Sequence, residues 1–535
     1  MLSVSGLRVS YFQNRKKSNI LNGISFDLKR GELLTVLGES GSGKSTIAKA
    51  ITGLLPPSAR LSGEMSIDDE TALSLSDATA SDWRSIRGKK VAMIFQDARQ
   101  SLNPAVKIKR QFAEMLVYHR LGSREGVTKI ILETLKALHF NDPERVLDSY
   151  PFQLSGGMCQ RVCIAMSICL QPLLLIADEP TSALDTVSQR EVLALLEEIK
   201  RGFGQSILFI THDIAVASAV SDRVVVLNKG SITEAETPER LFSNPKHSYT
   251  KSLIDARNFP CIHQDRPAPA LAAPVLQIRD LGKCFSPDTP VLKNVNISLY
   301  QREILGILGQ SGCGKSTLSR CIVGLEKAQR GEILYDGMNV LGLRGRRRRE
   351  LCKHIQLIFQ DARASLNPGY TAMQIVLEPL RYLKIVPARQ RQELARSYLG
   401  EVGIDGDTQN RRPPQLSTGQ CQRVAIARAL IVKPDALICD EAVSALDMSL
   451  QGQILELLLR LHERFGFGIL MISHDIRVLR SFCHRIAVMQ AGEFCEICGG
   501  GSELKESTHP YTQLLLSCEK ELEESYYSKI NLMAD

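Results

Sequence analysis

The stretch Gly38-Glu39-Ser40-Gly41-Ser42-Gly43-Lys44-Ser45 determines how the rest of the chain is interpreted, and it occurs twice. The second copy is Gly309-Gln310-Ser311-Gly312-Cys313-Gly314-Lys315-Ser316. Both fit G-x-x-x-x-G-K-[ST], a loop whose backbone N–H groups surround nucleotide phosphates. One such match also arises by chance in a Gly-Ser turn. Here an apolar strand precedes each copy and a helical pattern follows it, which predicts two phosphate-binding loops.

Length and composition describe an ordinary globular protein. A chain of 535 residues predicts two to four domains, and 44% hydrophobic with 23% charged residues excludes a disordered or fibrous chain. The net charge of +8 permits an anionic partner without selecting nucleotide, nucleic acid or lipid. The basic run 344–349 is interpreted as a solvated helix face rather than a nucleic-acid contact.

Cysteine usage and hydropathy predict an intracellular location. The 14 cysteines show no disulfide-framework spacing, which indicates reduced thiols. No charge-free apolar run reaches the roughly 18–20 residues that span a bilayer. Residues 1–11 lack the charged start and apolar core of a signal peptide. We therefore expect other chains to hold the protein at any membrane where it acts.

The segments around each loop are predicted as follows. Residues 2–28 are predicted to form an antiparallel hairpin with a polar turn at 13–19, and residues 91–97 a buried strand that ends near Gln96. Residues 107–148 are predicted to be helical, and residues 154–161 begin a helix that runs to 170. Tyr11 ends the first strand. It is either a half-buried strand aromatic, which the pattern alone favours, or a platform for a nucleotide base.

Acidic and histidine side chains follow two further buried strands. Residues 173–177 are apolar on both faces, as in a parallel sheet, and are followed by Asp178 and Glu179. Residues 207–211 are followed by His212, which taken alone also fits a capped or core histidine. Ligands bind at the carboxyl ends of parallel strands, so we expect the acids to face a ligand there.

The whole pattern repeats after a Pro/Ala linker at 258–274. Gln96 recurs 264 residues later as Gln360, and Gly38 recurs 271 residues later as Gly309. Three pairs are separated by 262 residues: Ser155 and Ser417, Asp178 and Asp440, and His212 and His474. Two homologous domains explain this register. We predict a first domain at 1–257, the linker at 258–274, a second domain at 275–519 and a C-terminal tail at 520–535.

Taken together, these motifs resemble the ATP-binding cassette (ABC) ATPases, the motor subunits of ABC transporters, over nearly the whole chain. Each half carries, in the family's order, an aromatic residue, a Walker A loop, a glutamine loop, a signature, a Walker B acid, a catalytic glutamate, a D-loop and a histidine. The resemblance implies an α/β fold with two tandem P-loop NTPase domains. Each would have a mainly parallel core sheet, an antiparallel β subdomain and a helical subdomain.

Two further motifs resemble the oligopeptide/dipeptide/nickel importer branch. Gln-Asp-Ala-Arg-x-Ser-Leu-Asn-Pro occurs at 96–104 and 360–368, and a tail motif occurs at 244–250 and 508–512, with Tyr249 and Tyr511 again 262 residues apart. Ala442 stands where a proline is usual, which is similar to the nickel-type second ATPase. In that branch the two ATPases are usually separate chains, whereas here they are fused.

The resemblance implies a role for each motif residue. Lys44 and Lys315 would contact the β- and γ-phosphates, and Glu179 and Glu441 would orient or deprotonate the attacking water. His212 and His474 would reach the γ-phosphate, and Gln96 and Gln360 would sense it while touching the membrane subunit. Mg²⁺ would be held by Ser45, Gln96 and Asp178, and by Ser316, Gln360 and Asp440. ATP would be held in the first half by Tyr11, Gly38, Ser40, Gly41, Ser42, Gly43, Lys44, Ser45, Thr46, Ser155 and Gly157, and in the second by Phe285, Gly309, Ser311, Gly312, Cys313, Gly314, Lys315, Ser316, Thr317, Ser417 and Gly419.

The signatures are expected to act in trans within an intramolecular cassette dimer. Ser417 and Gly419 would face Lys44, while Ser155 and Gly157 would face Lys315. Thr418 replaces the first glycine of the second signature. We expect the site that contains Lys44 to be slower but active.

Two groups of cysteines permit a second interpretation. Cys313 lies at a helix N-terminus beside Lys315, which lowers a thiol pKa, although it is equally well explained as a passive spacer. Some relatives carry a C-terminal iron–sulfur cluster. Here Cys261 stands alone in the first tail, and Cys495, Cys498 and Cys518 in the second lack a local fourth ligand, so these are interpreted as ordinary thiols.

The predicted function is an ATPase of an ABC importer, a translocase at the cytoplasmic face of the inner membrane. Its expected partners are two integral-membrane permease subunits and an extracytoplasmic solute-binding protein, with no nucleic acid. The cargo would be a peptide, nickel or a nickel chelate. The alternative is a soluble tandem ATPase acting on ribosomes or nucleic acid. A ribosome-acting ATPase has a long charged helical arm, a DNA-repair cassette has zinc-bearing insertions, and exporters have fused membrane spans; none of these features is present in the sequence.

Overall fold

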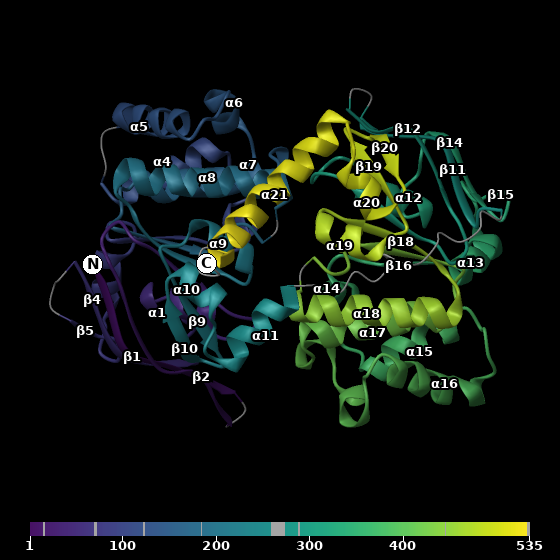
Figure 1. Ribbon diagram of the computed structural model, residues 1–535, viewed down its shortest axis with the longest axis horizontal. Helices are drawn as coiled ribbons and strands as arrows, with labels where there is room; N and C mark the ends of the chain where they lie inside the picture. Colours follow the sequence, from purple (N-terminus) through teal and green to yellow (C-terminus); the bar gives the residue numbers. More distant parts are fainter. Residues whose placement is uncertain are drawn as a thin grey trace. The chain divides into compact units, whose positions relative to one another are not determined.

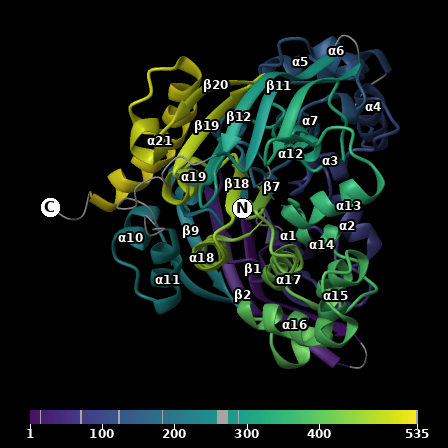
Figure 2. The same ribbon diagram turned by 90° about the vertical axis from the view of Figure 1, so that its right-hand side faces the viewer.

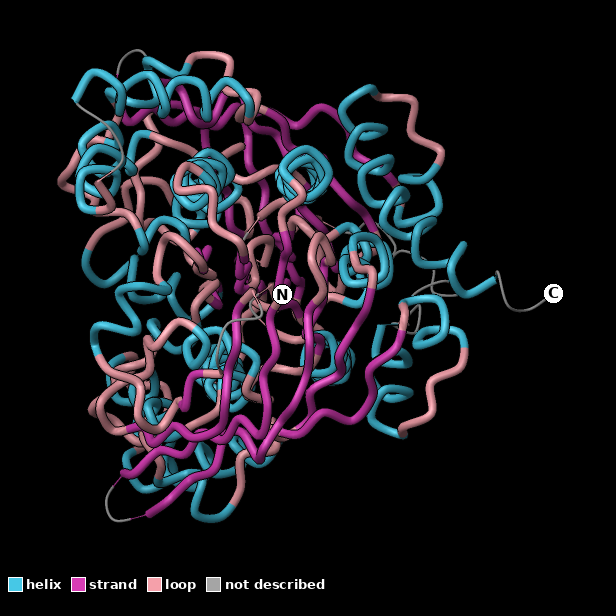
Figure 3. Tube along the Cα trace, turned by 90° about the vertical axis from the view of Figure 1, so that its left-hand side faces the viewer, coloured by secondary structure: helices cyan, strands magenta, loops and turns pink. Residues whose placement is uncertain are grey.

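The computed structural model describes residues 1–13, 16–68, 72–120, 124–182, 184–257, 273–286, 289–444 and 446–531. By their internal contacts the residues form two compact units, Met1–Asn258 with the residues from Cys518 onward, and Phe259–Ser517 (Figure 1). Each unit contains both strands and helices (Figure 3). Outside the described residues lie most of the predicted linker, Cys261, and the D-loop residues Ala183 and Ala445.

The first unit begins with a four-stranded antiparallel sheet in the order β2-β1-β4-β5. Its strands are β1 (Leu2–Gln13), β2 (Lys16–Leu28), β4 (Ala59–Ile67) and β5 (Leu73–Ser74). The alternating side chains Leu2, Val4, Leu7 and Val9 are buried, which explains why this stretch forms a half-buried strand. The antiparallel pairing of β1 and β2 confirms the predicted hairpin. The predicted turn at 13–19 was too long, because strand pairing already resumes at Lys16.

The core sheet of the first unit has the order β10-β9-β3-β8-β7-β6. Its strands are β3 (Leu33–Leu37), β6 (Val91–Ile94), β7 (Leu174–Asp178), β8 (Ser206–Thr211), β9 (Arg223–Asn228) and β10 (Ser231–Glu236). Only the β9–β10 pair is antiparallel. Every residue of β3, β7 and β8 is buried, as their continuous apolar sequences predict. The ends of these three strands therefore meet at one edge of the sheet.

Helices connect and cover these strands. They are α1 (Lys44–Ile51), α2 (Ala80–Ile86), α3 (Ala98–Ser101), α4 (Ile108–Tyr118), α5 (Arg124–Ala137), α6 (Pro143–Asp148), α7 (Gly156–Ile168), α8 (Thr186–Phe203), α9 (Ile214–Val220), α10 (Pro238–Ser243) and α11 (Ser248–Arg257). The region 107–148 is thus three helices. Arg120, at φ 60°, follows the end of α4, and Asp142 with Pro143 starts α6. α7 ends at Ile168, two residues before the predicted end.

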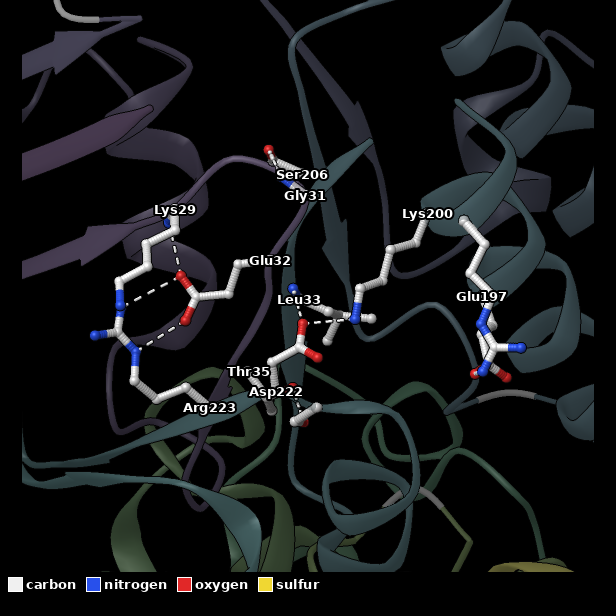
Figure 4. A network of polar contacts seen from close by, with 12 residues as sticks. Lys29, Gly31, Glu32, Leu33, Thr35, Glu197, Lys200, Ser206, Asp222 and Arg223 are labelled. Atoms are coloured by element: carbon white, nitrogen blue, oxygen red, sulfur yellow. Dashed lines mark hydrogen bonds and ion pairs between the residues drawn. The ribbon is translucent and has the colours of Figure 1, made fainter. Parts of the chain in front are cut away.

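A polar network fixes the beginning of β3, the strand that carries the first phosphate loop (Figure 4). Glu32 pairs with Arg223, with Oε1 3.1 Å from Nε. Asp222 accepts the backbone N–H of Leu33 at 2.7 Å and pairs with Lys200 at 2.5 Å. Because Asp222 and Arg223 lead into β9, these bonds hold β3 and β9 together at the end opposite the loop.

The second unit repeats this architecture, with sheet orders β12-β11-β14-β15 and β16-β17-β18-β13-β19-β20 (Figure 2). Its strands are β11 (Leu276–Ser286), β12 (Thr289–Leu299), β13 (Ile304–Leu308), β14 (Arg330–Tyr335), β15 (Met338–Asn339), β16 (Ile355–Ile358), β17 (Ala436–Asp440), β18 (Gly468–Ser473), β19 (Arg485–Gln490) and β20 (Glu493–Cys498). Its helices are α12 (Lys315–Ile322), α13 (Gly345–His354), α14 (Ala362–Ser365), α15 (Ala372–Tyr382), α16 (Ala388–Glu401), α17 (Thr418–Leu430), α18 (Met448–Phe465), α19 (Ile476–Phe482) and α20 (Gly500–Lys505). The α/β fold with two such domains is therefore confirmed.

The last helix, α21 (Pro510–Asn531), begins in the second unit, and its residues from Cys518 belong to the first. Tyr526 is buried in a cluster with Leu37 and Phe242 of the first unit. The guanidinium of Arg257 lies 3.8 Å from the centre of the Tyr526 ring. The predicted C-terminal tail, residues 520–535, thus supplies a core side chain to the first unit.

Two surface expectations can be compared with the structure. α13, which contains the basic run, has no buried residue, in agreement with a solvated helix face. Across the described ranges, no helix combines the length and apolar character needed to cross a bilayer.

Candidate functional site: two phosphate loops and their acids

Each phosphate loop joins a central strand to the helix that follows it, and tight packing explains its glycines. A Cβ built on Gly38 would lie 2.4 Å from the carbonyl oxygen of Leu227, and one on Gly309 would lie 2.4 Å from that of Met489. Gly43 and Gly314 precede α1 and α12 with φ of 108° and 114°, which favours glycine. The loop therefore keeps the close backbone curvature that a phosphate cradle needs.

The loop lysines lie buried above their own loops. Lys44 Nζ donates to the carbonyl oxygens of Gly38 at 2.7 Å and Glu39 at 2.9 Å. In the second unit the corresponding distances from Lys315 are 2.7 Å to Gly309 and 2.8 Å to Gln310. These carbonyls compensate the burial of each ammonium group. Both cations are thus placed at the start of the helix, where a phosphate would add its negative charge.

The other loop side chains differ in their exposure. Ser40 and Ser311 are exposed near the tip with Gly41 and Gly312, while Thr46 and Thr317 are half-buried in the first helical turn. Ser42 is buried, and its Oγ has no hydrogen-bond partner among the described residues. Cys313 occupies the equivalent position, 8% exposed, with Sγ 3.9 Å from Lys315 Nζ. The thiol is close to the ammonium, as the sequence led us to expect, but it is largely covered.

Two of the three predicted magnesium ligands of each unit, the serine and the aspartate, meet at the strand ends. Ser45 Oγ donates to Asp178 Oδ1 at 2.9 Å, and Ser316 Oγ donates to Asp440 Oδ1 at 3.1 Å. Burial raises the pKa of Asp178 to about 6, against the opposing effect of the hydrogen bond from Ser45. A hydroxyl beside a carboxylate is the hard oxygen set that suits Mg²⁺.

The second acid carries an additional hydroxyl. Ser319 Oγ donates to Asp440 Oδ2 at 2.9 Å, and Ala48 occupies the equivalent place in the first unit. Burial raises the pKa of Asp440, and the hydrogen bonds from Ser319 and Ser316 oppose that rise. Ser319 was not among the residues predicted from the sequence, although its spacing from Ser316 places both hydroxyls on one face of α12.

Each glutamate is turned out of its strand by an unusual backbone conformation. Glu179 and Glu441 have φ of 47° and 48°, a region that residues other than glycine seldom adopt. Gln96 Nε2 donates to Glu179 Oε2 at 2.8 Å, and Gln360 Nε2 donates to Glu441 Oε2 at 2.7 Å. The structure therefore brings each predicted glutamine directly to the predicted catalytic acid.

A histidine and a lysine complete the surroundings of each glutamate. His212 Nδ1 lies 3.3 Å and Lys44 Nζ 3.8 Å from Glu179 Oε1, and His474 Nδ1 lies 3.5 Å from Glu441 Oε1. Burial raises the pKa of Glu179, but the nearby His212 imidazole and Lys44 ammonium bring it below its usual value. The pKa of Glu441 is lowered in the same way against burial. The neighbouring cationic groups thus favour the ionised form of both glutamates.

The remaining predicted residues have contacts outside this cluster of acids. Tyr11 is half-buried and packs on the hydrophobic core, whereas Phe285 is 62% exposed, with Lys283 Nζ 4.9 Å from its ring centre. Ser155 and Ser417 are exposed N-caps of α7 and α17, accepting backbone N–H groups at 3.2 Å. A Cβ on Gly157 or Gly419 would meet Ser188 Oγ at 3.0 Å or Leu450 Cδ2 at 3.1 Å.

Two tyrosines of the tail motif were noted only as family markers, yet each contacts a phosphate loop. Glu39 N–H donates to Tyr249 Oη at 3.1 Å, and Gln310 N–H donates to Tyr511 Oη at 3.1 Å. The common 262-residue register of the tails was the signal available in the sequence.

The thiols of the second tail have contacts of their own. Cys495 and Cys498 both lie on β20, where Cys495 falls at a register shift in the pairing with β19. Cys495 Sγ donates to the carbonyl oxygen of Val488 at 3.3 Å. Among the residues that the structure covers, no three His, Cys, Asp or Glu side chains are grouped as metal ligands.

Comparison with known proteins agrees with this geometry. The ABC transporter family matches residues 21–182 and 292–444, and the oligopeptide/dipeptide transporter C-terminal region matches residues 233–287. The chain is 37% identical to the "Glutathione import ATP-binding protein GsiA" of Shigella dysenteriae and of Escherichia coli K12, and 36% identical to that of Pectobacterium atrosepticum. Each alignment covers 97% of this chain and 89% of the relative. The chain therefore belongs to the ABC transporter family and is an ABC ATPase with two cassettes in one polypeptide.

Proposed function

We propose that this ATPase drives the import of a short peptide, with glutathione the leading candidate, through two membrane-embedded permeases fed by an extracytoplasmic solute-binding protein. The oligopeptide/dipeptide region and the glutathione-import relatives support this class of cargo. The chain would act at the cytoplasmic face of the inner membrane. Because the described residues include no spanning helix, its attachment would depend on the permeases.

One observation carries the ATPase part of the proposal: both units hold the same set of proposed catalytic groups in the same contacts. In each, a buried glutamate is bonded by a glutamine, lies beside a histidine, and follows an aspartate that is bonded by the loop serine. Two active sites are therefore the economical interpretation. If only one site were functional, we would not expect the other unit to keep the same contacts at the same distances.

The residues fit Mg·ATP, and each group has a role in hydrolysis. Bound Mg²⁺ would neutralise the triphosphate, held by Ser45 and Asp178 in the first site and by Ser316 and Asp440 in the second. Glu179 and Glu441, kept ionised, would accept a proton from the attacking water. His212 and His474 would orient those carboxylates, and Gln96 and Gln360 would hold their second oxygens.

The signatures remain candidates for completing the sites in trans, as an intramolecular cassette dimer requires. Ser155 and Ser417 are exposed at helix N-termini, a position that suits an anionic phosphate. Thr418 is also exposed, and a Cβ built on the equivalent Gly156 meets no atom within 4 Å. The threonine therefore fits its own unit, and its effect would be limited to the nucleotide that it faces.

Nickel transport and ribosome binding are less well supported. The specific likeness to a nickel-type ATPase rests on Ala442 alone, and the relatives described above are named for glutathione import. The oligopeptide/dipeptide C-terminal region favours transport over a ribosomal role.

A reconstitution experiment tests the function. The chain would be purified with its permeases, placed in proteoliposomes with the binding protein, and assayed with ATP for uptake of labelled glutathione, an unrelated dipeptide and ⁶³Ni²⁺. We expect ATP-dependent uptake of glutathione or dipeptide that is abolished in the double variant Glu179→Gln, Glu441→Gln. ATP-dependent accumulation of ⁶³Ni²⁺ without either peptide would overturn the assignment of cargo. An intact complex without ATPase activity would overturn the function itself.

A further inference from the structure

The tail-motif tyrosines make the same contact in both units. In the first, the backbone N–H of Glu39 donates to Tyr249 Oη; in the second, that of Gln310 donates to Tyr511 Oη, and both distances are 3.1 Å. Glu39 and Gln310 are the second residues of their phosphate loops. The two contacts join segments 210 and 201 residues apart in sequence. A contact this distant in sequence, repeated at the same loop position, is a built feature of the cassette.

The tail holds each tyrosine firmly in place. Thr250, 1% exposed, donates to Glu234 of β10, and Thr512, fully buried, donates to Glu496 of β20 at 2.6 Å. A backbone N–H or hydroxyl from the turn before the helix adds a second bond to the same glutamates: Lys246 N–H to Glu234 at 2.7 Å and Ser507 Oγ to Glu496 at 2.6 Å. The tyrosine is therefore fixed to the edge strand of the core sheet.

The residue that the tyrosine contacts is also the one that holds the loop lysine. The carbonyl oxygen of Glu39 accepts from Lys44 Nζ at 2.9 Å and from Ser42 N–H at 3.2 Å. The carbonyl oxygen of Gln310 accepts from Lys315 Nζ at 2.8 Å and from Cys313 N–H at 3.3 Å. One peptide segment is thus held through its N–H by the tail and through its C=O by the lysine.

We propose that Tyr249 and Tyr511 are positioning residues for nucleotide binding. Each holds the second residue of its phosphate loop, Glu39 or Gln310, and through that residue the loop lysine. The proposal rests on the ATPase function above. The tyrosines act through Glu39 and Gln310, on the side of the loop that faces the tail helix. Without the tyrosine hydroxyl, the start of the loop is more mobile, and the lysine is less often in the position that a phosphate requires.

The test uses Tyr249→Phe, Tyr511→Phe and the double variant in the full chain, since phenylalanine removes only the hydroxyl. One hydrogen bond of ordinary strength corresponds to a change of about three- to tenfold in an equilibrium constant. We expect the double variant to raise KM for Mg·ATP by about that factor, with kcat changed less than about twofold. Tyr118→Phe and Tyr382→Phe, at 70% and 65% exposure, are the matched controls and should leave KM unchanged.

A second readout uses nucleotide-free protein. Amide hydrogen exchange in peptides covering Glu39 and Gln310 should accelerate in the respective single variants, while the melting temperature stays within about 2 °C of the parent. Thr250→Val and Thr512→Val, which loosen the tail without touching the loop, should accelerate the same amides less. A lower melting temperature with unchanged exchange and KM would assign the tyrosines to stability alone and overturn the proposal. If the parent chain hydrolyses ATP and the phenylalanine variants match it in both readouts, the proposal fails while the ATPase function stands.

Discussion

The second hydroxyl on Asp440 predicts that Ser319→Ala selectively weakens the second cassette. Ser319 is fully buried and donates to Asp440 Oδ2 at 2.9 Å, while Asp440 itself is 5% exposed. A hydrogen bond to a buried carboxylate contributes about 1.5–3 kcal/mol, because its loss leaves a desolvated charge with one partner fewer. That bond also ties α12 to the end of β17. Its removal should therefore ease the opening of this strand.

Native-state amide exchange of β17 is the direct assay, because it reports local opening inside a two-cassette chain. A loss of about 1.5–3 kcal/mol corresponds to exchange about 10- to 150-fold faster where opening limits exchange. β7 of the same molecules is the internal control, because Ala48 stands where Ser319 does and nothing changes there. The converse variant, Ala48→Ser, should slow exchange in β7.

Ser319 Oγ also lies 2.9 Å from the carbonyl oxygen of Ser316, and because the hydroxyl carries one hydrogen, this carbonyl shares or competes for the bond to Asp440; alanine removes both contacts. Ser319→Thr keeps the hydroxyl and should retain most of the protection. Equal exchange of β17 in the parent and in Ser319→Ala, or an equal acceleration in β7, would refute the reasoning.

Three further predictions follow from the structure. Burial lowers the pKa of His462 to about 4, so between about pH 6.5 and 4 the unfolded chain binds a proton that the folded chain does not. As pH falls through this window, the free energy of unfolding of the second cassette should decrease by up to about 3 kcal/mol. Urea titrations of His462→Gln should show a shallower pH dependence. If Thr418 slows the site it faces, Glu441→Gln should reduce ATP turnover more than Glu179→Gln, and equal losses would argue against the asymmetry. Because Cys313 is 8% exposed, maleimide should label it slowly and ATP should protect it, and rapid labelling in the presence of ATP would contradict its place in the loop.

The sequence was sufficient for the strands and loops that bear the chemistry. Continuous apolar runs such as 33–37 and 174–177 are typical of strands in the middle of a parallel sheet. The second of these runs therefore placed Asp178 at a strand end. The repeat then placed Asp440 by register. Boundaries were less certain where local signals are weak: the first hairpin turn was too long, and the single helical region at 107–148 is three helices.

Contacts between distant segments were beyond the reach of sequence patterns. Nothing in the local sequence of Tyr526 indicates that it completes a cluster with Leu37 nearly 500 residues away in the chain. The same applies to Tyr249 and Glu39. Such contacts depend on how the tail helix leaves the edge strand, which is settled by tertiary packing and not by periodicity.

The two cassettes serve as an internal comparison of which features the loop requires. Asp222 accepts the first N–H of β3, and in the second unit His484 Nδ1 accepts the equivalent N–H of Ile304 at 2.9 Å. A carboxylate and an imidazole differ in most of their chemistry, but both can accept a hydrogen bond from the backbone N–H at that position. The side chain has therefore changed while the bond that anchors the strand has persisted. The tyrosine contact at the other end of the strand has kept both its residue type and its distance, which is why we assign it a role beyond anchoring.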